Sequence, residues 1–509
     1  MAKKDENKLA YLQMPLPEGS KRKRMIRLNW GGLNKRQTSD TGELTAEKNI
    51  STLKYPHLTP SPKWEKMTFS AFGSLTVPTK INSDIICGYD RELVTYEKMD
   101  ASGSSAKKYC LNFYQAGEST LNLMYSVDAT DTIPNKLYSG HTMLRTITRN
   151  ADGSGSASEE YYLYPESIKV GVSRNQVNNI ITESWQGAVS APCHFENITA
   201  HLGRLFGTFK SNIYASNFNK FSNWTYDTAD ETSAANAWAS TTQANPKAGS
   251  NFTGIASYNN HVVCFKEDFM HEIYNTQNPF RITDVYADGT INGRSIQEVG
   301  GMLIFVSGTG IKAYTGSKPK ELGYKLSLDK IRDAVSGTDG RMYYLYCTLP
   351  DNTHKLFVYD SLVGEWSEEY FSAGEIISFT KAKNGIYALT SEGQVYRRTD
   401  SDYTHMWSFE TDFIMSRSID IKRVKKMQLY ADIPSGSYIK VYMLKNGESF
   451  NADTSSLVYD STGKSGLLPI RVLTRGTAAY GFKLHFEGYG YAEIYEMEID
   501  TEDGGEVYV

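Results

Sequence analysis

The stretch KLFVYDSLVGEW, from Lys355 to Trp366, decides how the fold of this chain is interpreted. An apolar strand ends at Tyr359-Asp360, a short loop turns at Gly364, and a tryptophan closes the phrase. The side chain of Asp360 is expected to accept hydrogen bonds from the amides of the turn. Trp366 is expected to pack between neighbouring sheets. The phrase therefore predicts one hairpin of a β-propeller blade, with Asp360, Gly364 and Trp366 as structural residues of its turn.

Phrases of the same kind recur along the chain. Each has an apolar strand, a polar turn and a second strand that ends in an aromatic residue, at Tyr214, Tyr274, Tyr314, Tyr359 and Tyr396. Their spacing of about 40 residues, with longer exceptions, is typical of four-stranded blades. The phrase SNFNKFSNW carries Asn in place of Asp and makes Trp224 a second blade-packing tryptophan. We predict a β-propeller of about six blades over residues 66–405; a pair of large β-sandwiches is the alternative.

The two ends of the chain have different patterns. Residues 1–65 have few strand-like runs, and Pro56, Pro60 and Pro62 oppose regular pairing there. This segment is interpreted as an extended arm without its own core, ordered against the body of the protein or a neighbouring copy. Residues 406–509 alternate strictly between apolar and polar residues, which predicts a small antiparallel β-sandwich. The predicted fold class is all-β: a β-propeller with an extended N-terminal arm and a C-terminal β-sandwich.

Three further segments break the strand pattern. Asn150–Glu160 and Asp227–Ser250 are polar and rich in small residues, and are expected to form long surface loops. In LSLDKIRDAV, Ser327 can cap a short helix whose apolar face carries Leu328, Ile331 and Val335.

Composition and motifs argue against chemistry at a site. The chain of 509 residues has a net charge of -4, which excludes a globally basic nucleic-acid binder. Its five cysteines include no C-x-x-C pair and are expected to be free and buried. The nine histidines form no metal-binding motif, and neither G-x-S-x-G nor a glycine-rich phosphate loop is present. We expect no catalytic residue, no cofactor, no metal and no enzymatic activity. No apolar run is long enough to span a membrane.

A basic cluster near the N-terminus is the candidate contact surface. KRKRMIR and the residues after it combine positive charge with an aromatic side chain, which suits a phosphate backbone or an acidic partner protein. Because the whole chain is acidic, a partner protein is favoured over nucleic acid. The candidate contact residues are Lys21, Arg22, Lys23, Arg24, Arg27, Trp30, Lys35 and Arg36.

Three stretches carry a resemblance to a family. They are residues 27–64, with a GG(L/M)N element and a later N(I/M) element, residues 311–331, and residues 410–447. Together they resemble the β-propeller tail proteins of tailed bacteriophages, of the tail nozzle or tubular tail type. The resemblance implies a virion structural protein without catalysis, made in the host bacterial cytoplasm and assembled as a ring or tip around the DNA exit path. It implies copies of the chain and neighbouring tail proteins as partners, with transient contact to DNA.

The alternative function is a propeller that binds or hydrolyses carbohydrate at the host surface. The chain has 35 Tyr and 7 Trp, which suits stacking on sugars. DSLVGEW approaches the S-x-D-x-G-x-x-W turn of propeller sialidases, but the spacing between Asp360 and Gly364 differs. A structural role for this turn is favoured over a catalytic one.

Overall fold

Strands form almost all of the regular structure in the computed structural model of this chain. It describes residues 23–503 except 29, 37–42, 72, 74, 76–77, 79, 82–83, 89–91, 101–106, 130–139, 150–154, 165–167, 175–180, 189–190, 227–232, 234, 241–249, 276, 279, 287, 329, 415–420, 454, 462–465 and 473–477. The helices among these residues are single 3₁₀ turns, η3 (Gly293–Ser295) and η4 (Tyr324–Leu326). The predicted all-β class is confirmed.

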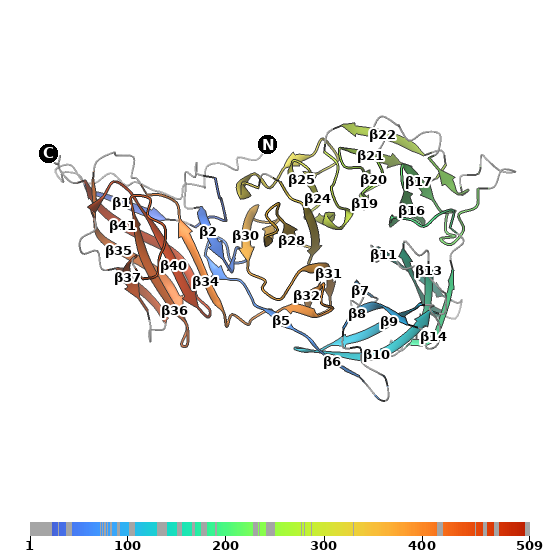
Figure 1. Ribbon diagram of the computed structural model, residues 1–509, viewed down its shortest axis with the longest axis horizontal. Coiled ribbons are helices and arrows are strands. Elements are labelled where there is room, and N and C mark those ends of the chain that lie inside the picture. Colours follow the sequence, from blue (N-terminus) through green and yellow to red (C-terminus); the bar gives the residue numbers. More distant parts are fainter. Residues whose placement is uncertain are drawn as a thin grey trace.

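Seven sheets follow one another along the described chain and lie in a ring, on the right of Figure 1. The first blade contains β7 (Asp84–Cys87), β8 (Leu93–Asp100), β9 (Lys107–Ala116) and β10 (Thr120–Ala129), with β6 (Thr68–Ala71) parallel to β10. The second contains β11 (Gly140–Arg149), β12 (Gly155–Tyr164), β13 (Ile168–Arg174) and β14 (Ile181–Ala188). The third contains β15 (Asn197–His201), β16 (Arg204–Phe209), β17 (Asn212–Ala215) and β18 (Trp238–Ala239).

The ring continues with three more four-stranded blades. The fourth contains β19 (Gly254–Tyr258), β20 (His261–Phe265), β21 (Phe269–Tyr274) and β22 (Arg281–Tyr286). The fifth contains β23 (Gln297–Val299), β24 (Met302–Ser307), β25 (Gly310–Tyr314) and β26 (Lys320–Glu321). The sixth contains β27 (Asp333–Thr338), β28 (Met342–Thr348), β29 (His354–Asp360) and β30 (Glu365–Glu369). The four strands of each blade are antiparallel neighbours in chain order, as in a β-propeller.

The seventh blade closes the ring with a strand from the other end of the chain. It contains β31 (Ile376–Ala382), β32 (Gly385–Thr390) and β33 (Val395–Arg398), and its outer strand is β5 (Trp64–Lys66). β5 pairs antiparallel with β33, with Trp64 opposite Arg398 and Glu65 opposite Arg397. β31 contacts β7 of the first blade, so the last and first blades are neighbours.

The cores lie between blades, and β28 shows why. All seven of its residues are buried. Tyr343, Leu345 and Cys347 pack with residues of the fifth blade, whereas Met342, Tyr344 and Tyr346 pack with residues of the seventh. Because side chains alternate between the two faces of a strand, a run such as MYYLYCT can be buried only between two sheets.

The C-terminal strands form two five-stranded sheets that share one core, on the left of Figure 1. One sheet has the order β1 (Lys23–Leu28), β41 (Glu493–Asp503), β35 (Lys422–Ile433) and β38 (Gly466–Val472), with β39 (Ala478–Ala479) beside β35. The other has the order β2 (Leu44–Lys48), β34 (Met406–Thr411), β40 (Phe482–Tyr489), β36 (Tyr438–Lys445) and β37 (Ser456–Asp460). Alternating residues of β35, β41, β36 and β40 fill the space between the sheets, as their sequence pattern indicates.

The N-terminal segment lies on the body of this chain. It supplies β1 and β2 to the two sheets of the sandwich and β5 to the propeller. Between β2 and β5, the strands β3 (Ile50–Ser51) and β4 (Thr59–Pro60) pair with each other. The segment therefore passes from one module to the other before the propeller begins (Figure 1).

The predicted number of blades and two predicted surface loops need correction. The described blades number seven rather than about six. Part of the difference lies in Asn150–Glu160, where residues 155–160 belong to β12 instead of a surface loop and pair with β11 and β13. Asp227–Ser250 also contains a strand, β18. Backbone pairing on both edges holds β12 in the sheet despite its polar composition.

The predicted helix at residues 327–335 is wrong. Ser327 has a φ of 51° and ends η4, and Val335 lies in β27. β27 pairs along its whole length with β28, and Val335 becomes buried in that sheet. Long-range pairing therefore outweighs the local helical pattern.

The packing of Trp366 gives a test of the blade interpretation. Its side chain is 1% exposed, and its ring lies 5.0 Å from that of Tyr359. Its Nε1 donates a hydrogen bond to the carbonyl oxygen of Leu322 at 3.1 Å. We predict that Trp366→Ala lowers the free energy of unfolding by about 3–5 kcal/mol, measured by urea denaturation.

Leu362→Ala is the matched control, because Leu362 belongs to the same turn and is 73% exposed. It should change the free energy of unfolding by less than about 0.5 kcal/mol. Equal effects of the two substitutions would contradict the packing role of Trp366.

Candidate functional site

The turn of KLFVYDSLVGEW is held by its aspartate. Asp360 is fully buried and accepts hydrogen bonds from Arg341, Nε to Oδ1 at 3.0 Å and Nη2 to Oδ2 at 2.5 Å. The amide of Leu362 donates to Oδ1 at 3.0 Å. Gly364, with a φ of 81°, donates its N–H to the carbonyl oxygen of Asp360 at 2.7 Å. These hydrogen bonds occupy both oxygens of the carboxylate and fix the conformation of the turn.

Trp224 lies in a core between the second and third blades. It is 8% exposed, and its ring lies 4.5 Å from that of Phe195. Tyr162 of β12 and Leu205 of β16 belong to the same cluster. Its position is that of a residue packed between blades.

Of the basic candidates, the structure describes the backbone of β1 and the side chains of Lys35 and Arg36. Lys21 and Arg22 lie outside the described residues. Lys23, Arg24 and Arg27 belong to β1, whose backbone pairs with β41 at the edge of the sandwich. The proposal that these five residues contact DNA or a partner stays a prediction.

Trp30 does not belong to a contact surface. It is 2% exposed in the sandwich core, with its ring 5.5 Å from that of Phe409 and 5.8 Å from that of Phe486. Its place beside the basic cluster in the sequence suggested an exposed aromatic, and the structure corrects this. Because β1 pairs with β41 in the sandwich, Trp30, two residues after the end of β1, lies in the sandwich core.

Lys35 and Arg36 lie beside the sixth blade. The Nζ of Lys35 donates to Oε2 of Glu368 at 2.6 Å. Arg36 is exposed, and its guanidinium lies 5.5 Å from the centre of the Tyr324 ring. Lys35 is thus engaged within the chain, and Arg36 keeps its charge at the surface.

The N-terminal segment covers the edge of the sixth blade. The amide of Leu33 donates to the carbonyl oxygen of Trp366 at 2.8 Å, and that of Asn49 donates to Glu368 O at 2.9 Å. β30 is the outer strand of its blade, so these bonds satisfy backbone groups that an open edge would leave unpaired.

Gly32 explains part of the GG(L/M)N element. A Cβ at this position would lie 2.7 Å from Cβ of Glu365 and 2.8 Å from the carbonyl oxygen of Trp366. Only a residue without a side chain lets the segment approach β30 this closely.

Asn49, of the N(I/M) element, bonds to both modules. Its Nδ2 donates to the carbonyl oxygen of Met406 at 2.8 Å, at the start of β34 in the sandwich. Its Oδ1 accepts from the amide of Tyr370 at 2.7 Å, directly after β30 of the propeller. Its φ of 60° lies in the left-handed region, which asparagine tolerates better than most residues.

Buried charges hold the segment against the sixth blade. The Nζ of Lys325 lies 2.6 Å from Oε1 of Glu43 and 2.6 Å from Oε2 of Glu365. Burial works to lower the pKa of Lys325, but Glu365 and Glu43 outweigh it and raise the pKa above its usual range. Lys325 is therefore held in its charged form between the N-terminal segment and β30.

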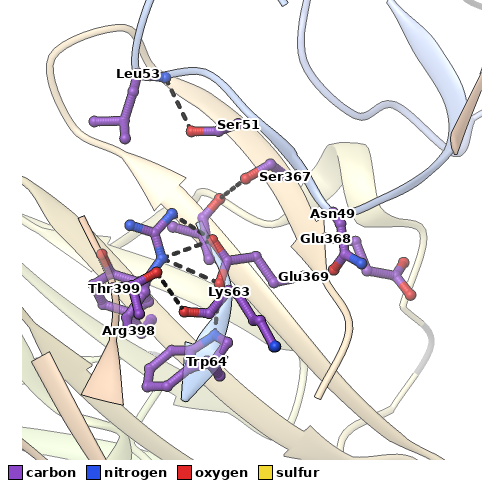
Figure 2. Close-up of polar contacts among 12 residues, drawn as sticks. Asn49, Ser51, Leu53, Lys63, Trp64, Ser367, Glu368, Glu369, Arg398 and Thr399 are labelled. Carbon is purple, nitrogen blue, oxygen red and sulfur yellow. Dashed lines mark hydrogen bonds and ion pairs between the residues drawn. The ribbon is translucent and has the colours of Figure 1, made fainter. Parts of the chain in front are cut away.

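A second buried cluster lies where the propeller closes, and Figure 2 shows it. We call Trp64, Glu369 and Arg398 the closure cluster. Nη2 of Arg398 donates to Oε1 of Glu369 at 2.6 Å, and Nε1 of Trp64 donates to Oε2 at 2.8 Å. Burial works to lower the pKa of Arg398, and the carboxylate of Glu369 raises it above its usual range. The cluster joins β33, β5 and β30, and thus the last two blades.

These residues were missed by the sequence analysis, although one signal was present. The phrase EWSEE follows the turn directly, and a carboxylate in a strand between buried residues needs a partner. The sequence could have marked Glu365 and Glu369 as paired. It could not show that their partners lie near residues 43, 325 and 398.

Other site classes have the following outcome in the part of the chain that the structure describes. No group of three or more His, Cys, Asp or Glu residues is placed to hold a metal ion. No described helix is long and apolar enough to cross a membrane. Cys264 and Cys347 are buried, whereas Cys87 and Cys193 are half-buried. Burial raises the pKa of the Cys347 thiol to about 12.

The ring of four-stranded sheets and its closure by β5 define the class of fold, a β-propeller, here followed by a β-sandwich. Among solved structures, the chain is similar to the Pan2 WD40 domain of Neurospora crassa, at 7% identity and a TM-score of 0.36, covering 63% of this chain and 92% of that one. It is similar to the Dos1 propeller, at 10% identity and a TM-score of 0.32, covering 74% and 96%.

A third similar structure is an exo-β-1,3-galactanase from Phanerochaete chrysosporium. It has 11% identity and a TM-score of 0.25, and the match covers 87% of this chain and 100% of that one. No family model and no curated protein matches the chain.

The closure cluster gives a second prediction. Arg398→Met leaves the carboxylate of Glu369 buried without its cation, and should lower the free energy of unfolding by about 3–5 kcal/mol in urea denaturation. Adding Glu369→Gln, which keeps an acceptor for Trp64, should recover most of the loss. The control is Lys425→Met, because the Lys425–Glu502 pair is exposed and worth at most about 1 kcal/mol. An Arg398 variant as stable as the Lys425 variant would disprove a stabilising role for the cluster.

Glu47 gives a prediction about pH. Burial raises the pKa of Glu47 well above its usual value near 4.5, against the opposing effect of the Glu368 N–H that donates to it at 2.6 Å. The folded state therefore keeps the proton that the unfolded state loses, and stability falls as the pH rises from about 4.5 to the folded pKa. Glu47→Gln keeps the acceptor and removes this titration.

We expect the urea midpoint of Glu47→Gln to exceed that of the wild type by more at each higher pH in that window. The gain is at most about 1.4 kcal/mol per pH unit. Glu298→Gln, at an exposed carboxylate, is the control. Parallel pH profiles for Glu47→Gln and the wild type would refute the assignment.

Proposed function

We propose that this chain is a non-enzymatic structural protein of a bacteriophage virion tail. In this proposal several copies form a ring or tip around the DNA exit path, in a nozzle, tubular or baseplate-like position. The protein is made in the host bacterial cytoplasm and becomes part of the virion. Its partners are other copies of itself and neighbouring tail proteins, with transient contact to DNA.

The observation that carries the proposal is the path of the N-terminal segment. The segment pairs with both sheets of the sandwich, covers β30 and completes the seventh blade. A subunit repeated around a ring must present its contact surfaces at one constant angle, because errors in angle accumulate from copy to copy. Strand pairing and buried ion pairs at the junction supply such a constant angle, which a flexible linker would not.

The residues of the segment that resembles the tail proteins have roles in this junction. Gly32 permits the close approach to β30, and Asn49 bonds to both modules. The resemblance and the junction thus concern the same positions. The basic residues that precede and form β1 are proposed to contact a neighbouring tail protein or DNA.

The test is the assembly state of the purified chain and its presence in particles. We expect sedimentation velocity and electron microscopy to show a closed oligomer, alone or with extracts that contain the neighbouring tail proteins. Mass spectrometry of purified particles should identify the chain. A protein that stays monomeric in both conditions, together with intact infectious particles that lack it, would overturn the proposal.

A pair of variants tests the role of the junction in assembly. Asn49→Gly removes side-chain bonds to both modules and should weaken ring formation about 10-fold or more, since two hydrogen bonds are lost. Asn446→Gly is the matched control, because Asn446 also has a left-handed φ, 51°, but lies in a hairpin of the sandwich. Equal assembly of the two variants would show that the junction does not set the geometry of the ring.

A further inference from the structure

The outer edge of β1 has no strand beside it in the part of the chain that the structure describes. β1 stands at the end of its sheet, in the order β1, β41, β35 and β38. Its described backbone hydrogen bonds are those of the ladder with β41. A free edge presents a row of unpaired N–H and C=O groups that can pair with a further strand. Residues 1–22, which precede β1, lie outside the described residues.

Three other edge strands of the sandwich are less open than β1. β2 lies against β30, and its Glu47 accepts a hydrogen bond from the amide of Glu368 at 2.6 Å. β38 contains Pro469, which has no N–H to donate to a further strand. β37 has five residues, and a register shift interrupts its pairing with β36. β1 keeps one register with β41 over its six residues and contains no proline, so it is the edge best suited to accept a strand.

The sign of the charge alternates from strand to strand across this sheet. In the register of the two ladders, Glu502 of β41 lies between Arg423 of β35 and Lys23 of β1. Four positions back along β41, Glu498 lies opposite Arg27 of β1. Opposite charges in directly facing positions stabilise a pair of strands, whereas like charges destabilise it. A strand added beside β1 is therefore expected to be acidic at the positions that face Lys23 and Arg27.

The other face of β1 continues the sandwich core. Ile26 and Leu28 stand in register with Ile499 and Met497, which are both fully buried. Because successive residues of a strand alternate between its faces, these positions lie on the core side and the charged rows on the outer side. A strand beside β1 would place its own alternate residues over the same core. The sheet therefore specifies a segment with acidic residues on one face and apolar residues on the other.

We propose that β1 binds an extended acidic segment of a neighbouring tail protein by strand addition. Backbone hydrogen bonds to the free edge supply the affinity, and carboxylates facing Lys23 and Arg27 supply the specificity. Pairing between the β1 strands of two copies is disfavoured by their like charge. Duplex DNA has no row of alternating N–H and C=O groups, so an open strand edge favours a protein partner. The identity of the partner as a tail protein rests on the proposed function.

The test uses the full chain and three fluorescein-labelled heptapeptides. The first alternates Glu and Val, the second has Pro in place of Val, and the third has Lys in place of Glu. Fluorescence anisotropy measures the dissociation constants at low salt, because dissolved ions screen exposed charges. We expect the Glu–Val peptide to bind. The Glu–Pro peptide has the same charge and cannot form a ladder, so it should bind at least about 10-fold more weakly. The Lys–Val peptide should not bind.

Hydrogen-exchange mass spectrometry locates the bound peptide. Successive residues of an antiparallel strand direct their N–H groups to opposite neighbours, so about half of the β1 amides face the free edge. We expect these amides to exchange rapidly in the chain alone and to become protected by the Glu–Val peptide. The amides that face β41 should be protected in both states. Free-edge amides that are already protected in the chain alone would contradict the proposal, because residues 1–22 or another copy would then occupy the edge.

A double variant tests the charged positions. Lys23→Gln with Arg27→Gln should weaken binding of the Glu–Val peptide about 5-fold or more, as for the loss of two exposed charge pairs. Lys318→Gln with Lys330→Gln is the matched control, because it changes the net charge equally at two exposed lysines of the propeller. It should bind the peptide as tightly as the wild type. If exchange shows that β1 of the first variant no longer pairs with β41, the Glu–Val and Glu–Pro peptides on the wild-type chain decide the matter.

Several results would overturn the proposal. One is equal binding of the Glu–Val and Glu–Pro peptides, because attraction between charges would then suffice. Another is peptide binding that the double variant leaves unchanged while β1 stays paired. A third is binding of a short DNA duplex, lost in that variant, by a chain that binds no acidic peptide. A chain that binds the Glu–Val peptide but stays monomeric in sedimentation keeps the strand site and contradicts the ring, so the two proposals fail separately.

Discussion

The pairing of β5 with β33 is the constraint on which the rest of the structure depends. The three strands β31–β33 leave one edge open, and only the strand at residues 64–66 covers it. The partners come from opposite ends of the propeller, so pairing them closes a loop of more than 300 residues, whose entropic cost must be offset by local contacts. The closure cluster supplies them, with a charged hydrogen bond and a tryptophan donor on a single carboxylate.

Closure also explains why the two modules are interleaved in the chain. A strand that must reach β33 from the N-terminus first passes along the sandwich and then along β30. On this route it gives β1 and β2 to the sandwich and covers the edge of the sixth blade. The N-terminal segment has no core of its own, and its apolar residues lie in the cores of the two modules instead. Trp30 and Leu44 lie in the sandwich core, and Leu33 lies in the core between the fifth and sixth blades.

The sequence predicted those parts of the fold that depend on short-range alternation. The hairpin phrases marked blades because residues such as Tyr343 and Tyr344 face opposite cores, and the sandwich strands alternated in the same way. The strand β12 was not predicted because its residues are largely polar, whereas its pairing with β11 and β13 is made by the backbone. The helical pattern at residues 327–335 gave a wrong prediction because the local spacing of apolar residues carries no information about pairing with β28. The role of Asp360 in its turn could be inferred, since its hydrogen bonds are local. The partners of Glu365 and Glu369 could not, because no local pattern specifies residues 29 or more positions away.

The bonds of Asn49 have a mechanical consequence. One side chain with only two rotatable bonds hydrogen-bonds to the first residue of β34 and to the residue directly after β30. The propeller and the sandwich are thus joined at Asn49 by two short hydrogen bonds. A torque on the sandwich cannot be dissipated along a linker. The torque acts directly on the end of β30, and the closure cluster transmits it from β30 to β33 and β5.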